Sequence, residues 1–143
     1  ERMKILFVEP GKEAQPAEIQ GDLKEMQAIV GGQIQALYPW EDPVALICND
    51  EGKLLSLPLN RALEDYDMIA GNFFICGIEG DAFVSLSDPL MIKYQEKFRY
   101  PELIGNSPMG LFAQKCSEQT YQRIQEELKH PPKRPKDKSA PER

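Results

Sequence analysis

The side chains that most often perform acid–base or metal chemistry are scarce in this chain. Its 143 residues include one histidine, His130, and three cysteines, Cys48, Cys76 and Cys116. A serine or cysteine nucleophile usually needs a neighbouring histidine, and structural zinc needs closely spaced cysteine or histidine pairs. His130 lies near the C-terminus and the cysteines are far apart. We therefore expect no catalytic residue, no metal site and no cofactor, and the sequence favours a binding protein over an enzyme.

Acidic side chains are the next candidates for chemistry. They cluster at Glu41-Asp42, at Glu64-Asp65 with Asp67, and at Glu79 with Asp81. Paired carboxylates can act as acid and base or can bind a hard cation. None of the clusters has the ligand spacing of an EF-hand loop, so we interpret them as solvated loop residues.

Two polar residues interrupt an apolar segment. Asn60 and Arg61 lie within Leu57–Leu63, where the other residues are leucine, proline and alanine. Asn60 could cap a turn, and Arg61 could pair with a carboxylate. We favour this structural interpretation, and a ligand-binding role for Arg61 is the alternative.

Tyr38 and Trp40 flank Pro39 just before the acidic pair Glu41-Asp42. An exposed aromatic residue at this place would be a candidate contact for a partner protein. Aromatic side chains more often lie at the edge of a core, and we favour that position for Trp40.

Charge is distributed unevenly along the chain. Residues 131–143 contain five basic and two acidic residues and carry a net charge of +3. Because the whole chain carries −6, residues 1–130 carry −9. An acidic body repels nucleic-acid backbones, so we expect it not to bind nucleic acid directly. It suits a basic partner surface or serves solubility. The basic, proline-rich residues 130–143 are expected to form a disordered, solvated tail, with an acidic partner or nucleic acid as the alternative contact.

The first half of the chain alternates between strand and helix patterns. Strands are expected over residues 4–8, 33–38 and 44–48, because these runs are apolar or alternate and are bounded by Gly, Pro or Asp. The spacing of Ile19, Leu23, Met26 and Val30 predicts a helix that ends at Gly31-Gly32. A hairpin turn with Gly52 at positive φ is expected to lead into a returning strand at residues 53–55.

The second half is expected to contain further strands, among them residues 82–84 after a turn at residues 77–80, and two helices. Residues 59–63 are interpreted as a short helical turn, and residues 68–76 as one long strand with a glycine kink at Gly71. Asp88-Pro89 marks the start of a helix that places Leu90, Tyr94 and Phe98 on one face. Residues 101–116 are expected to be irregular, and a last helix covers 117–129.

These elements predict an α+β fold in which a mixed, mostly antiparallel sheet is covered by two or three helices. The first strand–helix–strand unit leaves open a right-handed parallel crossover. One domain is expected over residues 3–129. No apolar run reaches the roughly 20 residues that a membrane helix needs, and no secretory signal is evident. The unpaired cysteines favour a reducing compartment, so a cytoplasmic location without membrane association is expected.

Six strings carry a resemblance to a known family. They are Val8–Lys12, Ile29–Gly32, Tyr38–Trp40, Asp42–Asn49, Leu57–Leu63 and Ile69–Ile75. Together they resemble a family of domains of unknown function that is typical of phages and conjugative elements of Gram-positive bacteria. The resemblance covers residues 3–98, so residues 99–129 form an extension outside it. It implies a bacterial mobile element and transfers no activity.

The resemblance also selects candidate binding residues. The polar members of the shared strings are the candidates for ligand or partner contacts, together with Trp40; they are Glu9, Lys12, Asp42, Asn49, Asn60 and Arg61.

Three functional hypotheses follow. The first is a non-catalytic, acidic interaction protein of a mobile element that binds a protein partner through its acidic body, and one concrete version is an inhibitor of a host system. The second is a small-molecule or nucleotide-binding domain with enzymatic potential, which requires Asn49, Asn60 and Arg61 to converge in one pocket. The third is a subunit of a larger assembly that docks through residues 101–116.

Overall fold

The computed structural model describes residues 2–64 and 67–130. Apart from His130, the predicted tail lies outside the described residues. The elements in chain order are β1 (Met3–Val8), β2 (Gln15–Ile19), α1 (Leu23–Val30), β3 (Ile34–Leu37), β4 (Val44–Asn49), β5 (Leu59–Leu63), β6 (Asp67–Ala70), β7 (Phe73–Glu79), β8 (Ala82–Val84), α2 (Asp88–Lys97), β9 (Glu102–Ser107), β10 (Gly110–Lys115) and α3 (Glu118–Lys129).

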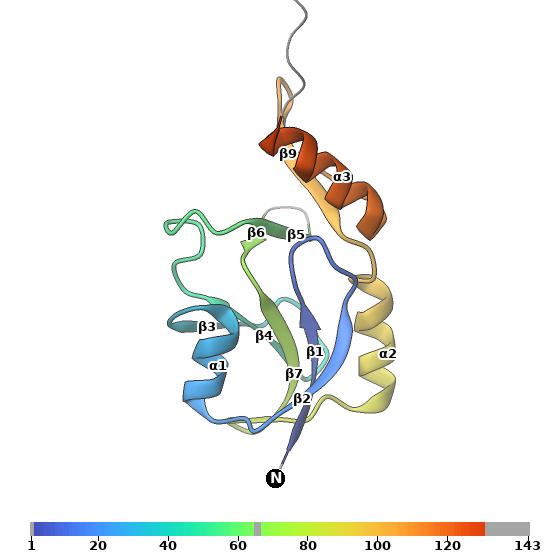
Figure 1. Ribbon diagram of the computed structural model, residues 1–143. Helices are drawn as coiled ribbons and strands as arrows, with labels where there is room; N and C mark the ends of the chain where they lie inside the picture. Colours follow the sequence, from blue (N-terminus) through green and yellow to red (C-terminus); the bar gives the residue numbers. More distant parts are fainter. Residues whose placement is uncertain (1, 65–66, 131–143) are drawn as a thin grey trace, which may run out of the picture.

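The main sheet has the strand order β2-β1-β7-β4-β3, and β8 pairs with β7 beside this path. All of its strand pairs are antiparallel. Figure 1 shows the sheet with α1 and α2 on its two flanks. The predicted α+β class with a mostly antiparallel sheet is confirmed. The expected parallel crossover from β1 to β3 is not formed, because the antiparallel pairs β1–β7, β7–β4 and β4–β3 leave β3 antiparallel to β1.

Two apolar layers lie on opposite faces of this sheet. All six residues of β4 are buried. Val44 and Leu46 pack in the layer that contains Tyr94 of α2, whereas Ala45 and Ile47 pack in the layer that contains Val30 of α1. Successive side chains of a strand point to opposite faces, so a continuous apolar run is what a strand covered on both faces requires.

The helix ends follow the capping signals in the sequence. Asp22 caps α1 by accepting a hydrogen bond from the Glu25 amide, and Gly31 ends the helix in the left-handed conformation with φ of 82°. Ser87 precedes α2, with Pro89 in its first turn, and Ser117 caps α3. The three predicted helices are therefore confirmed, except that Ile19, expected in the first of them, lies in β2 and α1 begins at Leu23.

Several local predictions are wrong. Residues 15–19 form β2, which pairs with β1 at the sheet edge and carries Pro16, a residue tolerated only at edges. Residues 53–55 form turns and no strand. Gly52 does not have a positive φ. Position 52 needs a glycine because the backbone of Ala70 is close: a Cβ there would lie 2.8 Å from the Ala70 carbonyl oxygen.

A second, two-stranded sheet is formed by β5 and β6. Residues 59–63 are thus a strand and not a helical turn. Residues 68–76 are not one strand either, because β6 belongs to this small sheet and β7 to the main sheet. The chain changes sheets at Gly71, which has φ of 83°. The glycine kink was placed correctly, but it separates two sheets.

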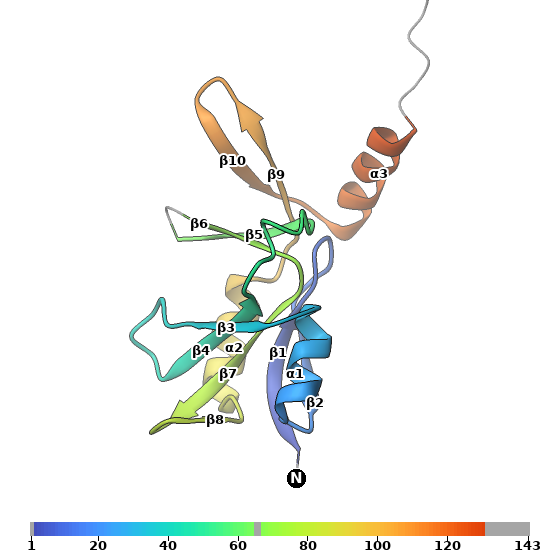
Figure 2. The same cartoon turned by 90° about the vertical axis from the view of Figure 1, so that its left-hand side faces the viewer.

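The C-terminal residues form a projecting unit. Residues 101–116, expected to be irregular, contain the antiparallel hairpin of β9 and β10. Figure 2 shows this hairpin and α3 extending from one end of the molecule, away from the main sheet. We refer to residues 102–129, which comprise β9, β10 and α3, as the C-terminal arm.

Candidate functional site

The candidate pair Asn60 and Arg61 lies where the domain meets the C-terminal arm. The register between β5 and β6 shifts between Leu59 and Arg61, which is the mark of a β-bulge. A bulge re-aims side chains, and here two successive residues are both fully buried instead of alternating. The polar interruption of the apolar segment is therefore a local distortion that directs both side chains inward.

Arg61 binds backbone carbonyl groups from three segments. Its Nη2 donates to the Lys12 oxygen at 2.6 Å and to the Phe98 oxygen at 3.0 Å. Its Nη1 donates to Asn60 Oδ1 at 2.8 Å and to the Asn60 carbonyl at 3.3 Å. Arg61 thus fastens the β1–β2 turn and the end of α2 to β5.

The guanidinium of Arg61 is buried without a salt bridge to a carboxylate among the described residues. Its Nε also has no hydrogen-bond partner there. Burial lowers the pKa of Arg61 to about 10, and the negative charge of Glu102 opposes this shift. The group stays charged at neutral pH. Because its side chain has no exposed surface, it cannot meet a ligand in this conformation.

Asn60 and Glu102 are buried beside Arg61, and we refer to these three residues as the junction between the domain and the C-terminal arm. Asn60 Nδ2 donates to the carbonyl oxygens of Val8, at 3.1 Å, and Gly71, at 2.8 Å. Glu102, at the start of β9, accepts a hydrogen bond from the Ala62 amide at 2.8 Å. These contacts satisfy backbone groups that the bulge would otherwise leave unpaired. Asn60 and Arg61 therefore have the structural role that the sequence favours, but by other contacts than expected. Asn60 lies in a strand and does not cap a turn, and Arg61 binds carbonyl groups where a carboxylate was expected.

Helix α3 contacts the body at the β1–β2 turn. A Cβ added at Gly11, whose φ is 80°, would lie 2.5 Å from Cε1 of Tyr121. Glu118 accepts a hydrogen bond from the Glu13 amide at 2.7 Å. Burial raises the pKa of the Tyr121 hydroxyl. The turn that Arg61 holds from one side is therefore covered by Tyr121 from the other.

Trp40 and Asp42 act together at α2. The Trp40 ring lies 4.7 Å from the Tyr94 ring, and its Nε1 donates to Glu64 at 2.7 Å. Asp42 accepts hydrogen bonds from Lys93 Nζ at 2.6 Å and from the Tyr94 hydroxyl at 2.7 Å, and these donors lower the pKa of Asp42. Trp40 lies at the edge of the core, and Asp42 anchors the helix.

The side chains of the remaining candidates do not join Asn60 and Arg61, and Lys12 meets Arg61 only through its carbonyl oxygen. Lys12 is exposed, and Glu9 is half-buried at the end of β1. Asn49 is buried at the end of β4, where its side chain donates to the Val30 carbonyl at 3.0 Å. Asn49 lines a cavity of about 210 Å³ to which Asn60 and Arg61 do not contribute. The convergence required by the pocket hypothesis is therefore not found for Asn49 and Arg61.

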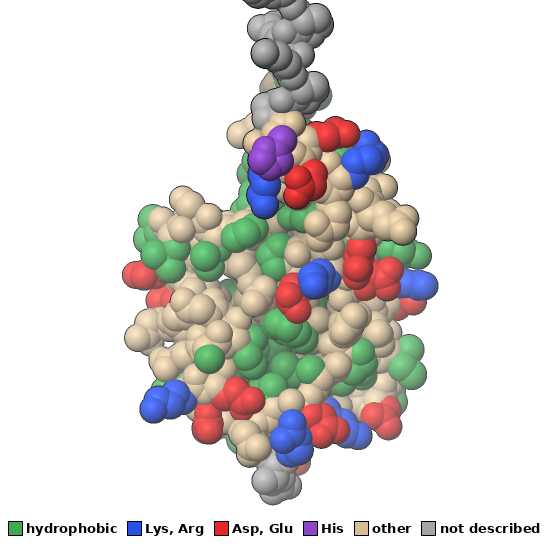
Figure 3. All heavy atoms as spheres, viewed as in Figure 1, with side chains coloured by type: hydrophobic (Ala, Val, Ile, Leu, Met, Phe, Trp, Pro, Cys, Tyr) green, Lys and Arg blue, Asp and Glu red, His purple; other side chains and the backbone are tan. Residues whose placement is uncertain are grey.

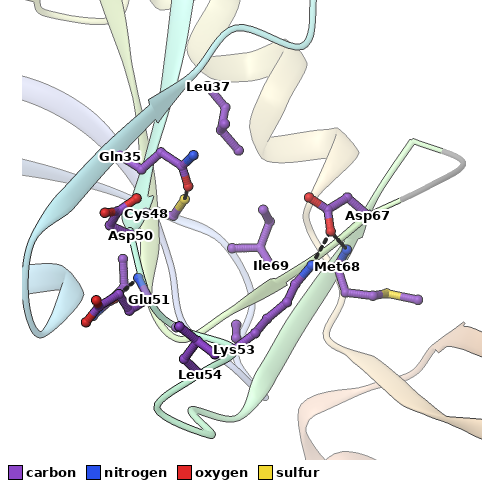
Figure 4. Close-up of a pocket in the computed structure, with 13 residues that line it drawn as sticks. Gln35, Leu37, Cys48, Asp50, Glu51, Lys53, Leu54, Asp67, Met68 and Ile69 are labelled. Carbon is purple, nitrogen blue, oxygen red and sulfur yellow. Dashed lines mark hydrogen bonds and ion pairs between the residues drawn. The ribbon is translucent and has the colours of Figure 1, made fainter.

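This cavity is shown in Figure 4. It lies between β3, β4, the turn after Asn49 and β6, and Lys53 forms an ion pair with Asp67 at its edge. Burial raises the pKa of Cys48 to about 11, so its thiol is protonated at neutral pH and is a poor nucleophile. No group of side chains suited to hold a metal occurs in residues 2–64 and 67–130. The Cys48 thiol therefore does not act as an activated nucleophile in this cavity.

Comparison with known proteins gives one match. A family model described as Domain of unknown function (DUF3846) matches residues 3–99. The chain belongs to this family. The DUF3846 domain runs from β1 to the end of α2, and the arm lies beyond it. No match is found among curated proteins or among solved structures.

Beyond the DUF3846 match, the arm exposes apolar side chains. Exposed fractions are 94% for Met109, 57% for Leu111, 45% for Phe112 and 69% for Leu128. The hairpin, α3 and the start of β5 enclose a groove of about 450 Å³. Its apolar lining residues are Pro58, Leu59, Leu103, Ile104, Phe112, Tyr121, Ile124 and Leu128.

Charges are mixed over the face shown in Figure 3. Acidic and basic side chains are interspersed around a central hydrophobic area, and no continuous acidic surface is visible on that face. In the described part of the chain, no helix has the length and apolar character to cross a membrane.

Sequence reasoning missed Glu102, Tyr121 and the groove. The available signal was Pro108-Met109-Gly110, a turn sequence between the apolar pairs Leu103-Ile104 and Leu111-Phe112. That pattern predicts a hairpin, and the hairpin creates one wall of the groove.

Proposed function

We propose that this chain is a non-catalytic interaction protein and that it binds a protein partner through its C-terminal arm. The observation that supports this proposal is the groove of about 450 Å³ between the β9–β10 hairpin and α3. The groove is lined largely by apolar side chains, and α3 buries none of its residues. Grooves of this kind accept apolar anchors of a partner, and aromatic residues such as Phe112 and Tyr121 often carry much of the binding energy.

Two side chains that could serve a small-molecule or catalytic site are engaged or unreactive in this fold. Arg61 has its Nη donors engaged by carbonyl groups, and Cys48 holds its proton. The small-molecule or nucleotide hypothesis has less support, because Asn49 and Arg61 serve different places in the fold.

In its concrete form the proposal places the protein in the cytoplasm of a bacterium, as a product of a phage or conjugative element that inhibits a host system. The family resemblance motivates the mobile-element origin, and the three free cysteines suit a reducing compartment. The acidic body, with −9 over residues 1–130, makes direct nucleic-acid binding by the body unfavourable.

The test is affinity capture from host lysate, followed by titration of the captured protein in purified form. The intact chain is compared with a double variant, Phe112→Ser with Leu128→Ser, which removes apolar side chains from the groove. Ile92→Ser on α2 is the matched control, because Ile92 is 70% exposed but lies in the DUF3846 domain.

The intact chain and the control are expected to retain the same partner, and the double variant to lose it. Capture at low and at moderate salt then separates apolar from charge-based recognition. If the double variant binds the purified partner as tightly as the intact chain does, the arm is not the binding surface.

A further inference from the structure

Strand β10 has a free edge. In the part of the chain that the structure describes, its only strand neighbour is β9. All six residues of β10 are exposed. Half of the backbone N–H and C=O groups of such a strand point away from its neighbour, and an isolated two-stranded hairpin is only marginally stable in water. A further strand on this edge would satisfy those groups.

The two outer strands of the main sheet, β2 and β3, are protected against further pairing, and β10 is not. Edge strand β2 contains Pro16 and Glu18, and β3 at the opposite edge has only four residues. Proline, charge and short length are the usual means by which an edge avoids further pairing. β10 is six residues long and contains no proline or acid, and its single charge is Lys115 at the end.

We propose that β10 pairs antiparallel with β10 of a second copy of this chain, so that the arm is a symmetric dimerisation unit. The inference rests on the proposed function, because it treats the arm as the interaction surface, and it names one occupant of that surface. A twofold axis brings the same strand of both copies together, so β10 must complement itself.

The sequence of β10 meets this condition. Pairing centred on Ala113 sets Leu111 opposite Lys115 of the other copy and Phe112 opposite Gln114. Like charges do not face each other in this register. The stem of a lysine can also cover an apolar neighbour while its charged end remains in water.

The twofold axis also sets where the two grooves lie. Phe112 lies on one face of the hairpin and lines the groove beside α3, while Leu111 points to the other face. An axis perpendicular to the new four-stranded sheet keeps equivalent faces together, so both grooves open on the same side. One strand pair buries less surface than a standard stable interface, so the dimer is expected to depend on concentration.

The test is sedimentation velocity on the purified full chain over a range of concentrations. Leu111→Lys places a positive charge opposite Lys115 of the other copy, whereas Leu111→Glu places an opposite charge there. Both variants remove the same exposed leucine. Like charges directly across strands destabilise pairing and opposite charges stabilise it, and symmetry makes each contact occur twice.

Leu111→Lys is expected to raise the dimer dissociation constant about tenfold, and Leu111→Glu to change it far less. Combining Leu111→Lys with Lys115→Glu is expected to restore dimerisation. Ile92→Lys, in the DUF3846 domain, is the control and is expected to leave the constant unchanged.

A full chain that stays monomeric at every concentration overturns the inference, as does equal weakening by Leu111→Lys and Leu111→Glu. The two proposals fail separately. If the chain is monomeric but still captures its partner, only the proposal of a dimer is overturned. If the chain dimerises but its Phe112→Ser, Leu128→Ser variant still captures the same partner, only the proposal that the groove binds this partner is overturned.

Discussion

The DUF3846 domain and the C-terminal arm use apolar residues in opposite ways. In the domain, the six residues of β4 are all buried between two helix-covered faces. In the arm, the six residues of β10 are all exposed, although leucine, phenylalanine and alanine are among them. The domain also exposes large apolar side chains, at Leu23, Tyr38, Leu54, Leu55 and Ile92, but the shorter arm exposes four of them, at Met109, Leu111, Phe112 and Leu128. Exposed apolar side chains are therefore denser in the arm.

The same contrast separates α2 from α3. α2 buries Met91 and Tyr94 and is joined to the β3–β4 loop through Asp42. α3 buries no residue and contacts the body mainly through Glu118 and Tyr121. Most helical stability in proteins comes from packing of an apolar face, so α3 is expected to open more readily than α2. A partner in the groove would supply the packing that α3 lacks.

The largest expected effect breaks the junction between the two regions. Arg61→Met keeps a side chain of similar length but removes the donors that bind the Lys12 and Phe98 carbonyl groups. A buried acceptor left without a partner costs about 1–3 kcal/mol, so we expect the free energy of unfolding to fall by about 3 kcal/mol. Urea denaturation followed by Trp40 fluorescence measures this change.

The matched control for Arg61 lies in the arm. Arg123 on α3 has a 62% exposed side chain and forms an exposed ion pair with Glu127. Arg123→Met is expected to change the free energy of unfolding by less than about 0.5 kcal/mol. Equal losses for both arginine variants would contradict the assignment of Arg61 as the fastening of the junction.

A smaller effect is expected at the contact between α3 and the domain. Gly11→Ala forces alanine into a left-handed conformation, which costs about 1 kcal/mol, and also brings its Cβ against Tyr121. Gly31→Ala has the same backbone problem at φ of 82°, but its nearest neighbour there is Asn49 Nδ2 at 3.9 Å. Comparing the Gly11→Ala and Gly31→Ala variants therefore separates the effect of backbone strain from the effect of the collision with α3.

Hydrogen–deuterium exchange provides the measurement for this pair. Gly11→Ala is expected to speed amide exchange throughout α3, whereas Gly31→Ala is expected to leave α3 unchanged. Adding Tyr121→Ala to Gly11→Ala removes the collision, but it also removes the contact, so fast exchange should persist. Slow exchange in α3 of Gly11→Ala would show that this contact does not hold the helix.

The elements that sequence predicted best are those whose local signals agree with their packing. α1 has its cap at Asp22 and its glycine at Gly31, and β4 has an uninterrupted apolar run. Each of these sequence patterns is compatible with only one type of element when both faces of the sheet are covered. These are residues of the DUF3846 domain, where burial within the chain decides the structure.

The wrong predictions concern segments whose structure is determined by contacts with residues far away in the sequence. Leu59–Leu63 reads as a helical turn, but pairing with β6 and the contacts of Arg61 make it a bulged strand. Asn60 and Arg61 were identified as a linked polar pair, yet their partners Val8, Lys12 and Phe98 are far away in sequence and could not be inferred from it. The Glu102 contact depends on a hairpin that the sequence analysis left irregular.

The smallest expected effect concerns the anchoring of α2 at low pH. Hydrogen bonds from Lys93 and Tyr94 lower the pKa of Asp42 below its ordinary value of 3.8. The carboxylate therefore contributes stability above pH 3.8, and this contribution is lost as the pH falls through the lower pKa of the folded state. Asp42→Asn removes the titrating group, so the variant should lose less stability than the parent chain over this acidic range.

The measurement is the urea midpoint as a function of pH, with Asp81→Asn as a control in the exposed turn after β7. The control is expected to follow the parent chain, and Asp42→Asn to start from lower stability at neutral pH and converge with the parent in acid. Convergence would show that α2, unlike α3, is held by a charged anchor as well as by its buried face. Parallel curves for the parent and Asp42→Asn would instead assign the anchoring of α2 to Tyr94 and Met91 packing alone.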